Sequence, residues 1–179
     1  MRVIAGSHRG AKLIAPRGSA TRPTGDRVRE ALFSILGPVD RARVLDLFAG
    51  SGALAIEALS RGAGEATLVD SSPAAIAAIR HNLSALGIAA EVRRQSAASF
   101  LKHARTDARQ YDLVFLDPPY RQASVASRDL CEALLPVLAP VARVVAESDR
   151  RAPLTLEDLD LVDERCYGDT LIRIHRVCT

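Results

Sequence analysis

The sequence has few of the residues that build disulfide frameworks, metal sites and membrane spans. It contains no tryptophan, one methionine and three cysteines, and Cys131, Cys166 and Cys178 are widely spaced. An odd number of scattered cysteines favours neither a disulfide framework nor a zinc site, so we expect no metal. No apolar run approaches the length of a bilayer-spanning helix, and the first residues lack the apolar core of a secretory signal. We therefore expect a cytoplasmic protein that is not attached to a membrane.

The excess of basic residues is small over the whole chain but large at its start. The formal net charge is +3, yet residues 1–29 hold a single acid, Asp26. The basic residues of this stretch are Arg2, Arg9, Lys12, Arg17, Arg22, Arg27 and Arg29. Such an imbalance favours attraction to phosphate groups, as in nucleic-acid binding, although charge alone is equally compatible with a solvated basic surface.

Residues 1–25 are predicted to form a small extension ahead of the main domain. Two short apolar segments, at 3–5 and 12–14, are separated by a polar stretch that contains two glycines. This pattern predicts a β-hairpin with His8 and Arg9 at its tip. The extension would therefore present basic side chains on a short loop.

Residues 26–179 are predicted to form the main domain, whose first helix has Asp26 as its predicted N-cap. Apolar runs typical of buried strands then alternate with helical patterns. The expected strands are 44–48, 67–70, 91–93, 113–116, 142–146, 161–167 and 170–177, and the helices between them end near Arg61, Gly87, Arg105 and Leu138. Ser72 is the predicted N-cap of the helix that ends at Gly87. Repeated βα units predict an α/β fold: a doubly wound, mostly parallel seven-stranded sheet with an antiparallel C-terminal strand.

The strand at 113–116 ends in the turn Asp117-Pro118-Pro119-Tyr120. Proline has no N–H, so the carbonyls that precede the two prolines have few donors nearby. A carboxylate beside a free carbonyl makes a pair of acceptors, which suits a planar amino group with two N–H donors. Tyr120 adds a flat aromatic face. We interpret the turn as a pocket for an exocyclic amine on a flat ring; the alternative is a simple strand terminator.

A glycine-rich loop follows the expected strand at 44–48 and opens a helix. Gly50 and Gly52 allow close approach of a ligand to the backbone, and the helix start offers free N–H groups. With Ala55, the run fits the degenerate dinucleotide fingerprint, and Asp70 follows about twenty residues later, as a ribose-binding acid does. The loop therefore predicts a nucleotide-type ligand, and an NAD-dependent enzyme is one candidate.

Asp46 argues against a dinucleotide. It lies in the strand four residues before Gly50, close to the crevice that a pyrophosphate would occupy. Like charges would repel there, whereas the cationic amino-acid part of S-adenosylmethionine would be attracted. A satisfied buried carboxylate is the simpler alternative for Asp46. Together with Asp70 and the turn at 117–120, however, it favours S-adenosylmethionine as the cofactor and methyl transfer as the reaction.

The chain also resembles a known family. Residues 44–52 and 117–120 resemble the cofactor and catalytic motifs of Rossmann-like, amine-directed methyltransferases. Residues 2–13 and 22–33 narrow the resemblance to the bacterial 16S ribosomal RNA guanine-N2 methyltransferases of the RsmD type, over essentially the whole chain. The resemblance implies a Rossmann-like fold and methyl transfer from S-adenosylmethionine to the exocyclic N2 amine of a guanine in 16S rRNA.

The resemblance also implies roles for individual residues. The implied cofactor-binding residues are Asp46, Phe48, Ala49, Gly50, Gly52, Asp70, Ser71, Gln95, Ser96, Ala97 and Asp117. The implied catalytic residues are Asp117, Pro118, Pro119 and Tyr120, the last stacking on a flipped-out base. The implied RNA-binding residues are Arg2, His8, Arg9, Lys12, Arg22, Arg27 and Arg29. Many relatives have an acid beside the adenine ring, where this chain has Gln95 and Ser96.

Three other functions remain open at this point. An adenine-N6 methyltransferase acting on DNA or RNA would also grip a planar exocyclic amine. A noncatalytic RNA-binding protein could use the same scaffold, and the NAD-dependent enzyme is the third alternative. For the guanine-N2 reaction the expected partner is 16S rRNA within an assembling or assembled small ribosomal subunit, and we expect the protein to act as a monomer.

Overall fold

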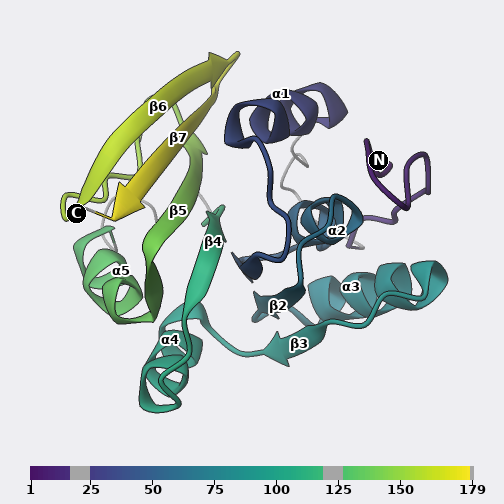
Figure 1. Ribbon diagram of the computed structural model, residues 1–179, viewed down its shortest axis with the longest axis horizontal. Helices are drawn as coiled ribbons and strands as arrows, with labels where there is room; N and C mark the ends of the chain where they lie inside the picture. The colour runs from purple at the N-terminus through teal and green to yellow at the C-terminus, as the bar shows by residue number, and fades with distance from the viewer. Residues whose placement is uncertain (17–24, 119–126, 178–179) are drawn as a thin grey trace.

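The computed structural model describes residues 1–16, 25–118 and 127–177, and the structural statements below concern these residues (Figure 1). The strands are β1 (Arg43–Leu47), β2 (Glu65–Asp70), β3 (Glu91–Arg94), β4 (Tyr111–Leu116), β5 (Leu138–Asp149), β6 (Leu159–Tyr167) and β7 (Thr170–Val177). The helices are α1 (Asp26–Leu36), α2 (Ala53–Ser60), α3 (Pro73–Leu86), α4 (Ala97–Thr106), α5 (Ser127–Leu134) and the 3-10 turn η1 (Leu135–Val137).

All seven strands belong to one sheet in the order β3-β2-β1-β4-β5-β7-β6. β1 to β5 run parallel to one another, and β7 lies antiparallel between β5 and β6. This arrangement confirms the predicted doubly wound, mostly parallel sheet. The chain runs outward from β1 to β3 and then crosses back to β4, so the strand order reverses between β1 and β4. Such a reversal leaves a crevice at the carboxyl ends of the two strands, where ligands of this class of sheet bind.

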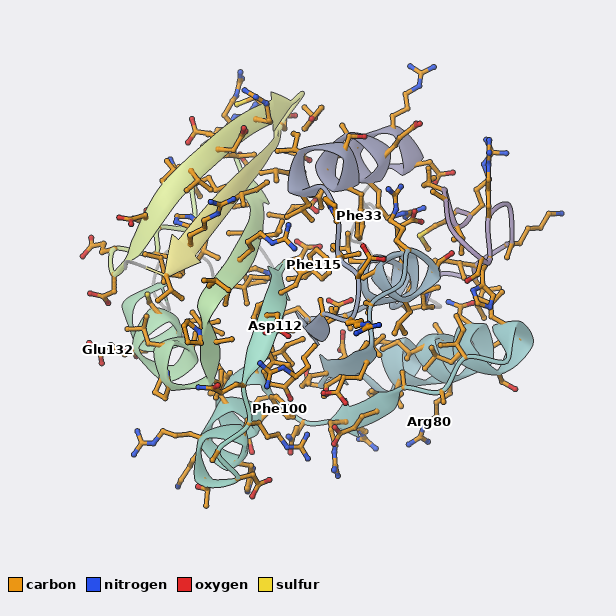
Figure 2. The ribbon with its side chains drawn as sticks, viewed as in Figure 1. Phe33, Arg80, Phe100, Asp112, Phe115 and Glu132 are labelled. Atoms are coloured by element: carbon orange, nitrogen blue, oxygen red, sulfur yellow. The ribbon has the colours of Figure 1, made fainter. Side chains whose placement is uncertain are left out.

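Helices cover both faces of the sheet (Figure 1). On one face α1, α2 and α3 pack over a core that includes Phe33 and Ile79, and on the other α4 and α5 pack over Phe100 and Leu134. The rings of Phe33 in α1 and Phe115 in β4 pack against one another at a tilt of 52°, with centroids 5.9 Å apart (Figure 2). Among the described residues, no helix is long and apolar enough to cross a membrane.

Two predicted helix ends are confirmed, and one predicted cap is wrong. Ser72 caps α3 by accepting the Ala75 N–H at 3.4 Å, and Gly87 ends that helix in the left-handed conformation, with φ of 64°. Asp26 does not cap α1, because Gly25 holds the N-cap position and Asp26 is the first helical residue. The Asp26 carboxylate instead pairs with Arg29, one turn further on, at 3.0 Å.

The largest boundary differences are at α5 and β5. The helix expected to reach Leu138 ends at Leu134, and the 3-10 turn that follows contains Pro136. Proline has no N–H with which to continue a helix, which explains the early end. β5 then extends beyond both ends of the strand expected at 142–146. Its extra carboxyl-terminal residues include Glu147, which becomes important at the site.

Residues 1–16 form a hairpin-like loop that is attached to α2. A single antiparallel bridge joins Arg2 and Lys12, so the predicted hairpin has one bridge instead of two regular strands. The backbone N–H groups of Ile4 and Ala5 donate to the Glu57 carboxylate in α2 at 2.7 and 3.0 Å. A buried acid of the main domain thereby holds the loop in place.

Candidate active site

The carboxyl ends of β1, β4 and β5 bring three acids together: Asp46, Asp117 and Glu147, which we call the acid cluster. β1 and β4 are neighbours in the sheet, and so are β4 and β5. Leu116 of β4 pairs with Ala146 of β5, so Asp117 and Glu147 are the next residues along adjacent strands. The cluster therefore lies at the crevice that the strand reversal creates.

The three acids lie on the same face of the sheet. Two positions before each acid, the strand residue belongs to the core beneath α1, α2 and α3; these residues are Val44, Phe115 and Val145. Side chains alternate along a strand, so each acid points toward this same face. Glu147 was not predicted as a site residue. Its signal in the sequence is an acid at the end of the apolar run Val144-Val145-Ala146.

Asp46 is buried, with 3% of its surface exposed, and one of its oxygens accepts the Ala55 N–H at 3.2 Å at the start of α2. Burial disfavours the charged carboxylate and raises the pKa of Asp46 to about 7. The hydrogen bond from Ala55 opposes this change, and the negative charge of Asp70 adds to it. A cationic ligand beside Asp46 would favour the charged form.

The raised pKa of Asp46 predicts that the stability of the ligand-free protein falls as pH rises. Well below the ordinary pKa of 3.8 the carboxyl is protonated in the folded and unfolded states; between 3.8 and about 7 it is charged in the unfolded state and mostly protonated in the folded state; above this range it is charged in both, and the cost of burying the charge is complete. We expect a loss of roughly 2–4 kcal/mol between pH 4.5 and 8 that Asp46→Asn lacks, because the amide stays neutral and still accepts the Ala55 N–H. Urea unfolding of both proteins at each pH measures the difference, and parallel pH profiles would contradict it.

Asp117 is the first residue after β4, and its side chain reaches the surface of the described structure. Surrounding protein atoms disfavour its charged form, and the nearby charges of Glu147 and Asp46 add to this effect, so the pKa of Asp117 is well above its usual value. Pro118 is buried directly behind it. Pro119 and Tyr120 lie outside the described residues, so their predicted roles stay predictions.

The glycine loop follows β1 in a conformation that most residues avoid. Phe48, Gly50 and Gly52 all have positive φ, of 65°, 56° and 77°. A Cβ at Gly52 would meet Leu68 at 2.8 Å, whereas a Cβ at Gly50 would find only the Phe48 carbonyl oxygen, at 3.9 Å. Gly52 is therefore required for packing, and Gly50 borders open space that a ligand can use. The positive φ of Phe48, which is rare outside glycine, was not predicted.

Asp70 at the end of β2 is held by the backbone. Its two oxygens accept the N–H groups of Gly50 at 2.9 Å and Ser72 at 2.8 Å. Each carboxylate oxygen has a second lone pair, so the side chain keeps the capacity to accept ribose hydroxyls. Ser71 is exposed beside it, and the Phe48 and Ala49 positions complete the loop between β1 and α2.

The segment after β3 lies beside Asp70. The Gln95 N–H donates to the Asp70 carbonyl at 3.1 Å, and Ser96 caps α4 by accepting the Ser99 N–H at 3.2 Å. Ala97 is buried at the start of α4. A groove of about 290 Å³ adjoins this segment, and it is lined by Arg93, Gln95, Phe100, His103, Ala104, Asp107 and Arg109. Of Gln95 and Ser96, only Gln95 lines this groove.

The predicted basic surface is only partly present. Arg2, Arg9 and Lys12 are exposed on the N-terminal loop, His8 is half-buried in it, and Arg27 is exposed on α1. Arg22 lies outside the described residues. The structure places Arg9 and Lys12 at the loop surface, where they are free to meet phosphate groups.

The prediction that Arg29 binds RNA is wrong. Its side chain is fully buried, donates to the Arg2 carbonyl oxygen, and lies 3.9 Å from Glu57 as well as 3.0 Å from Asp26. A guanidinium that is enclosed by the protein cannot reach a phosphate. Arg29 instead joins α1, α2 and the N-terminal loop.

Within residues 1–16, 25–118 and 127–177, no group of three or more histidines, cysteines, aspartates or glutamates is arranged to hold a metal ion. The acid cluster and the glycine loop are the chemical features that the strand reversal brings together. An arrangement of this kind can bind a cationic nucleotide-type ligand and present acceptors to a second molecule beside it.

Comparisons with known proteins agree with this geometry. A family model described as conserved hypothetical protein 95 matches residues 1–176. Ribosomal RNA small subunit methyltransferase D from Haemophilus influenzae is 38% identical over 98% of this chain and 93% of that protein. The solved structure of yhhF from Escherichia coli matches with a TM-score of 0.83 and 36% identity, over 99% of this chain and 97% of that chain.

A more distant structure, SMU.776 complexed with SAH, matches at 18% identity with a TM-score of 0.70, over 84% of this chain and 48% of that chain, and shows the same fold. The family match and the similarity to the Haemophilus protein confirm the resemblance inferred from residues 2–13, 22–33, 44–52 and 117–120. This chain therefore belongs to the conserved hypothetical protein 95 family, the RsmD-type family of ribosomal RNA small subunit methyltransferases.

Proposed function

We propose that this protein methylates the exocyclic N2 amine of a guanine in the 16S rRNA of the small ribosomal subunit, with S-adenosylmethionine as the methyl donor. The observation that carries the proposal is the position of Asp117 at the end of β4, next to β1 and its glycine loop. A site for an amine and a site for a nucleotide-type cofactor thus meet at one edge of the sheet. The membership of the RsmD-type family supports rRNA as the substrate.

The residues at this edge fit S-adenosylmethionine. Asp46 and the rest of the acid cluster suit the positive charges of its ammonium and sulfonium groups. Gly50 borders open space for close approach, and Asp70 keeps acceptor capacity for the ribose hydroxyls. We assign the adenine end to the Gln95, Ser96 and Ala97 segment. SMU.776, which has the same fold, was solved with SAH, and this supports the choice of cofactor.

In the proposed reaction the protein acts by positioning and charge. S-adenosylmethionine supplies an activated methyl group on its sulfonium. The Asp117 carboxylate and the Pro118 carbonyl accept the two N–H groups of the guanine amine, which aims the nitrogen lone pair at the methyl carbon. A new N–C bond forms as the C–S bond breaks, which leaves S-adenosylhomocysteine, and the methylated amine then gives up one proton to solvent, directly or through Asp117. Neither a covalent enzyme intermediate nor a metal is needed for these steps.

We further propose that residues 1–25 are an RNA-contacting extension of a methyltransferase domain at 26–179. Within this extension, Arg9 and Lys12 project from a loop that Glu57 holds against α2. The protein would act as a monomer, in the cytoplasm, on an assembling or assembled small subunit. Tyr120 is assigned to stacking on the flipped-out guanine, as the sequence implies.

The test of the proposed function is methyl transfer from labelled S-adenosylmethionine to three substrates, followed by nucleoside analysis. The substrates are unmethylated small ribosomal subunits, protein-free 16S rRNA and duplex DNA. N2-methylguanosine from a ribosomal substrate is the expected product, and the ratio of subunit to free RNA shows whether ribosomal proteins help to form the target. Formation of N6-methyladenine instead would show that the pocket accepts adenine. No transfer by a protein that binds the cofactor would overturn the proposal in favour of a binding protein.

Removing two charges from the N-terminal loop should weaken RNA binding. Each phosphate contact releases counterions, so Arg9→Gln with Lys12→Gln should lower affinity and reduce the slope of log K against log salt by about 1–2. The matched control is Lys102→Gln with Arg105→Gln, which removes the same charge from exposed positions on α4. Filter binding or anisotropy with 16S rRNA at several salt concentrations measures the slope. Equal slopes for the two double variants would exclude the loop from the RNA footprint.

A further inference from the structure

We propose that Glu147 accepts the N1–H of the target guanine and so selects guanine over other amine-bearing bases. This inference rests on the proposed function, since it concerns the base whose N2 amine is methylated. Glu147 would be a specificity residue that touches the substrate, beside the acceptors that hold the amine.

The position of Glu147 follows from the sheet. It comes one residue after Ala146, which pairs with Leu116, whereas Asp117 comes one residue after Leu116. The two carboxylates are therefore neighbours across β4 and β5, and both point to the face beneath α1, α2 and α3. Their closeness is also evident from the effect of the Glu147 charge on Asp117. Glu147 is half-buried, so its carboxylate can meet a ligand that enters over Asp117.

The chemistry of guanine matches this pair of carboxylates. Its Watson–Crick edge presents the N1–H donor directly beside the donors of the N2 amine, and enzymes that flip a base read this edge by hydrogen bonds. When Asp117 and the Pro118 carbonyl hold the amine, N1–H is the next group along the edge, on the ring side of the amine. A carboxylate offers about four acceptor positions, so Glu147 can accept N1–H in addition to its other contacts.

Adenine presents the opposite pattern to Glu147. Beside its exocyclic N6 amine, N1 carries a lone pair and no hydrogen. A carboxylate there would face another acceptor, which leaves both groups without a donor once the bound base has displaced the water between them, and this is unfavourable. The turn at Asp117 and Pro118 cannot by itself discriminate between guanine and adenine, because the exocyclic amine of each base offers it two N–H donors. An adjacent carboxylate supplies the missing discrimination.

The best probe is 2-aminopurine, which has the same amine at C2 as guanine but an N1 without hydrogen. The site of N2-methylguanosine is first mapped with the wild-type protein. Small subunits are then reconstituted from ligated 16S rRNA that carries guanine or 2-aminopurine at this position, and kcat/KM for methyl transfer is measured with each. We expect the wild-type protein to prefer guanine by at least about a hundredfold.

Glu147→Gln should reduce this preference to below about tenfold, because the amide can accept N1–H from guanine or donate N–H to N1 of 2-aminopurine. The loss of O6 in 2-aminopurine affects both proteins alike, so the change in the ratio reports on N1. Glu65→Gln is the matched control. Glu65 is the first residue of β2, at the end of the sheet away from the acid cluster, so this variant should keep the wild-type ratio. If the variant turns over too slowly, the preference is measured instead as the ratio of dissociation constants of the two RNAs in the presence of S-adenosylhomocysteine.

The outcomes separate the two proposals. An unchanged ratio with normal N2-methylguanosine formation by the wild-type protein would overturn the role of Glu147 and leave the proposed function standing. An equal loss of kcat/KM on the guanine and 2-aminopurine substrates would also overturn the role of Glu147, since it would show that Glu147 acts only through the charge of Asp117. If the wild-type protein forms no N2-methylguanosine, the proposed function itself fails.

Discussion

Asp117→Ala should lower methyl transfer to the ribosomal substrate by at least about a hundredfold while it leaves binding of S-adenosylhomocysteine within about threefold of wild type. In the proposed reaction the side chain supplies one of the two acceptors for the amine, whereas Asp46 on the adjacent strand β1 remains to face the cofactor. Without Asp117 the amine has a single acceptor, the Pro118 carbonyl, and its lone pair is no longer aimed at the methyl carbon. Single-turnover assays and calorimetric titration measure the two quantities separately.

Two controls make this result specific. Asp117→Asn keeps the shape and one acceptor oxygen but places an N–H₂ group against the donors of the substrate, so it should also be strongly impaired. Asp112→Asn changes another acid of β4 that is paired with Arg43 at 2.9 Å and lies away from the carboxyl end of the strand, and it should keep nearly normal turnover. Normal turnover by Asp117→Ala would contradict the assignment of this turn as the amine pocket.

Glu57→Ala should destabilise the protein by roughly 3–5 kcal/mol, because it removes the buried carboxylate that faces Arg29 and leaves the partly exposed Asp26 as the ion-pair partner of that buried guanidinium. Glu57 is fully buried in α2. Its oxygens accept the N–H groups of two N-terminal residues and the Arg61 guanidinium at 2.7 Å, and Arg29 lies 3.9 Å away. For a chain of this length the midpoint of thermal unfolding should fall by roughly 10 °C.

Thermal unfolding followed by circular dichroism measures this change, and hydrogen exchange adds a local readout. The amides of Ile4 and Ala5 donate to Glu57, so they should exchange much faster in the variant. Glu30→Ala removes an exposed acid from α1 and should change stability by less than about 0.5 kcal/mol. A loss below about 1 kcal/mol for Glu57→Ala would show that the buried ion pair does not hold the loop.

A combined variant distinguishes charge from packing. Arg29→Met together with Glu57→Leu removes both charges and fills the space with apolar side chains, which often restores stability to a protein that depends on a buried ion pair. We expect the double variant to be more stable than Glu57→Ala. Since the double variant lacks the carboxylate that holds the N-terminal loop, its RNA binding should still be weakened.

The order of strands and helices was predictable from local patterns. Four apolar residues at 113–116 predict a strand that is buried on both faces, and β4 has this character. Ser72 and Gly87 predict the ends of α3 because capping depends on residues only a few positions apart. The glycine loop and the turn at 117–120 were also visible as candidates, since each is a short run with unusual chemistry.

The burial of Arg29 and the place of Glu147 could not be predicted in this way. A basic residue at the start of α1 resembles an RNA contact until the N-terminal loop and α2 close over it. Glu147 lies in a strand whose carboxyl end was expected at residue 146, and its neighbour Asp117 is distant in the sequence. Which strands become neighbours depends on the sheet order, which no local pattern contains.

Local sequence patterns were enough to predict the fold class, the glycine loop after β1 and the turn at 117–120 as a candidate amine pocket, because hydrophobic periodicity and the chemistry of glycine and proline act over a few residues. Which acids meet depends on the tertiary structure. It placed Asp46, Asp117 and Glu147 at one edge, where burial raises the pKa of Asp46 and of Asp117. The charge of Asp70 adds to the effect on Asp46, and the charges of Glu147 and Asp46 add to the effect on Asp117. Charge and burial act through space, so the electrostatics of the site depend on contacts between segments that are far apart in the chain.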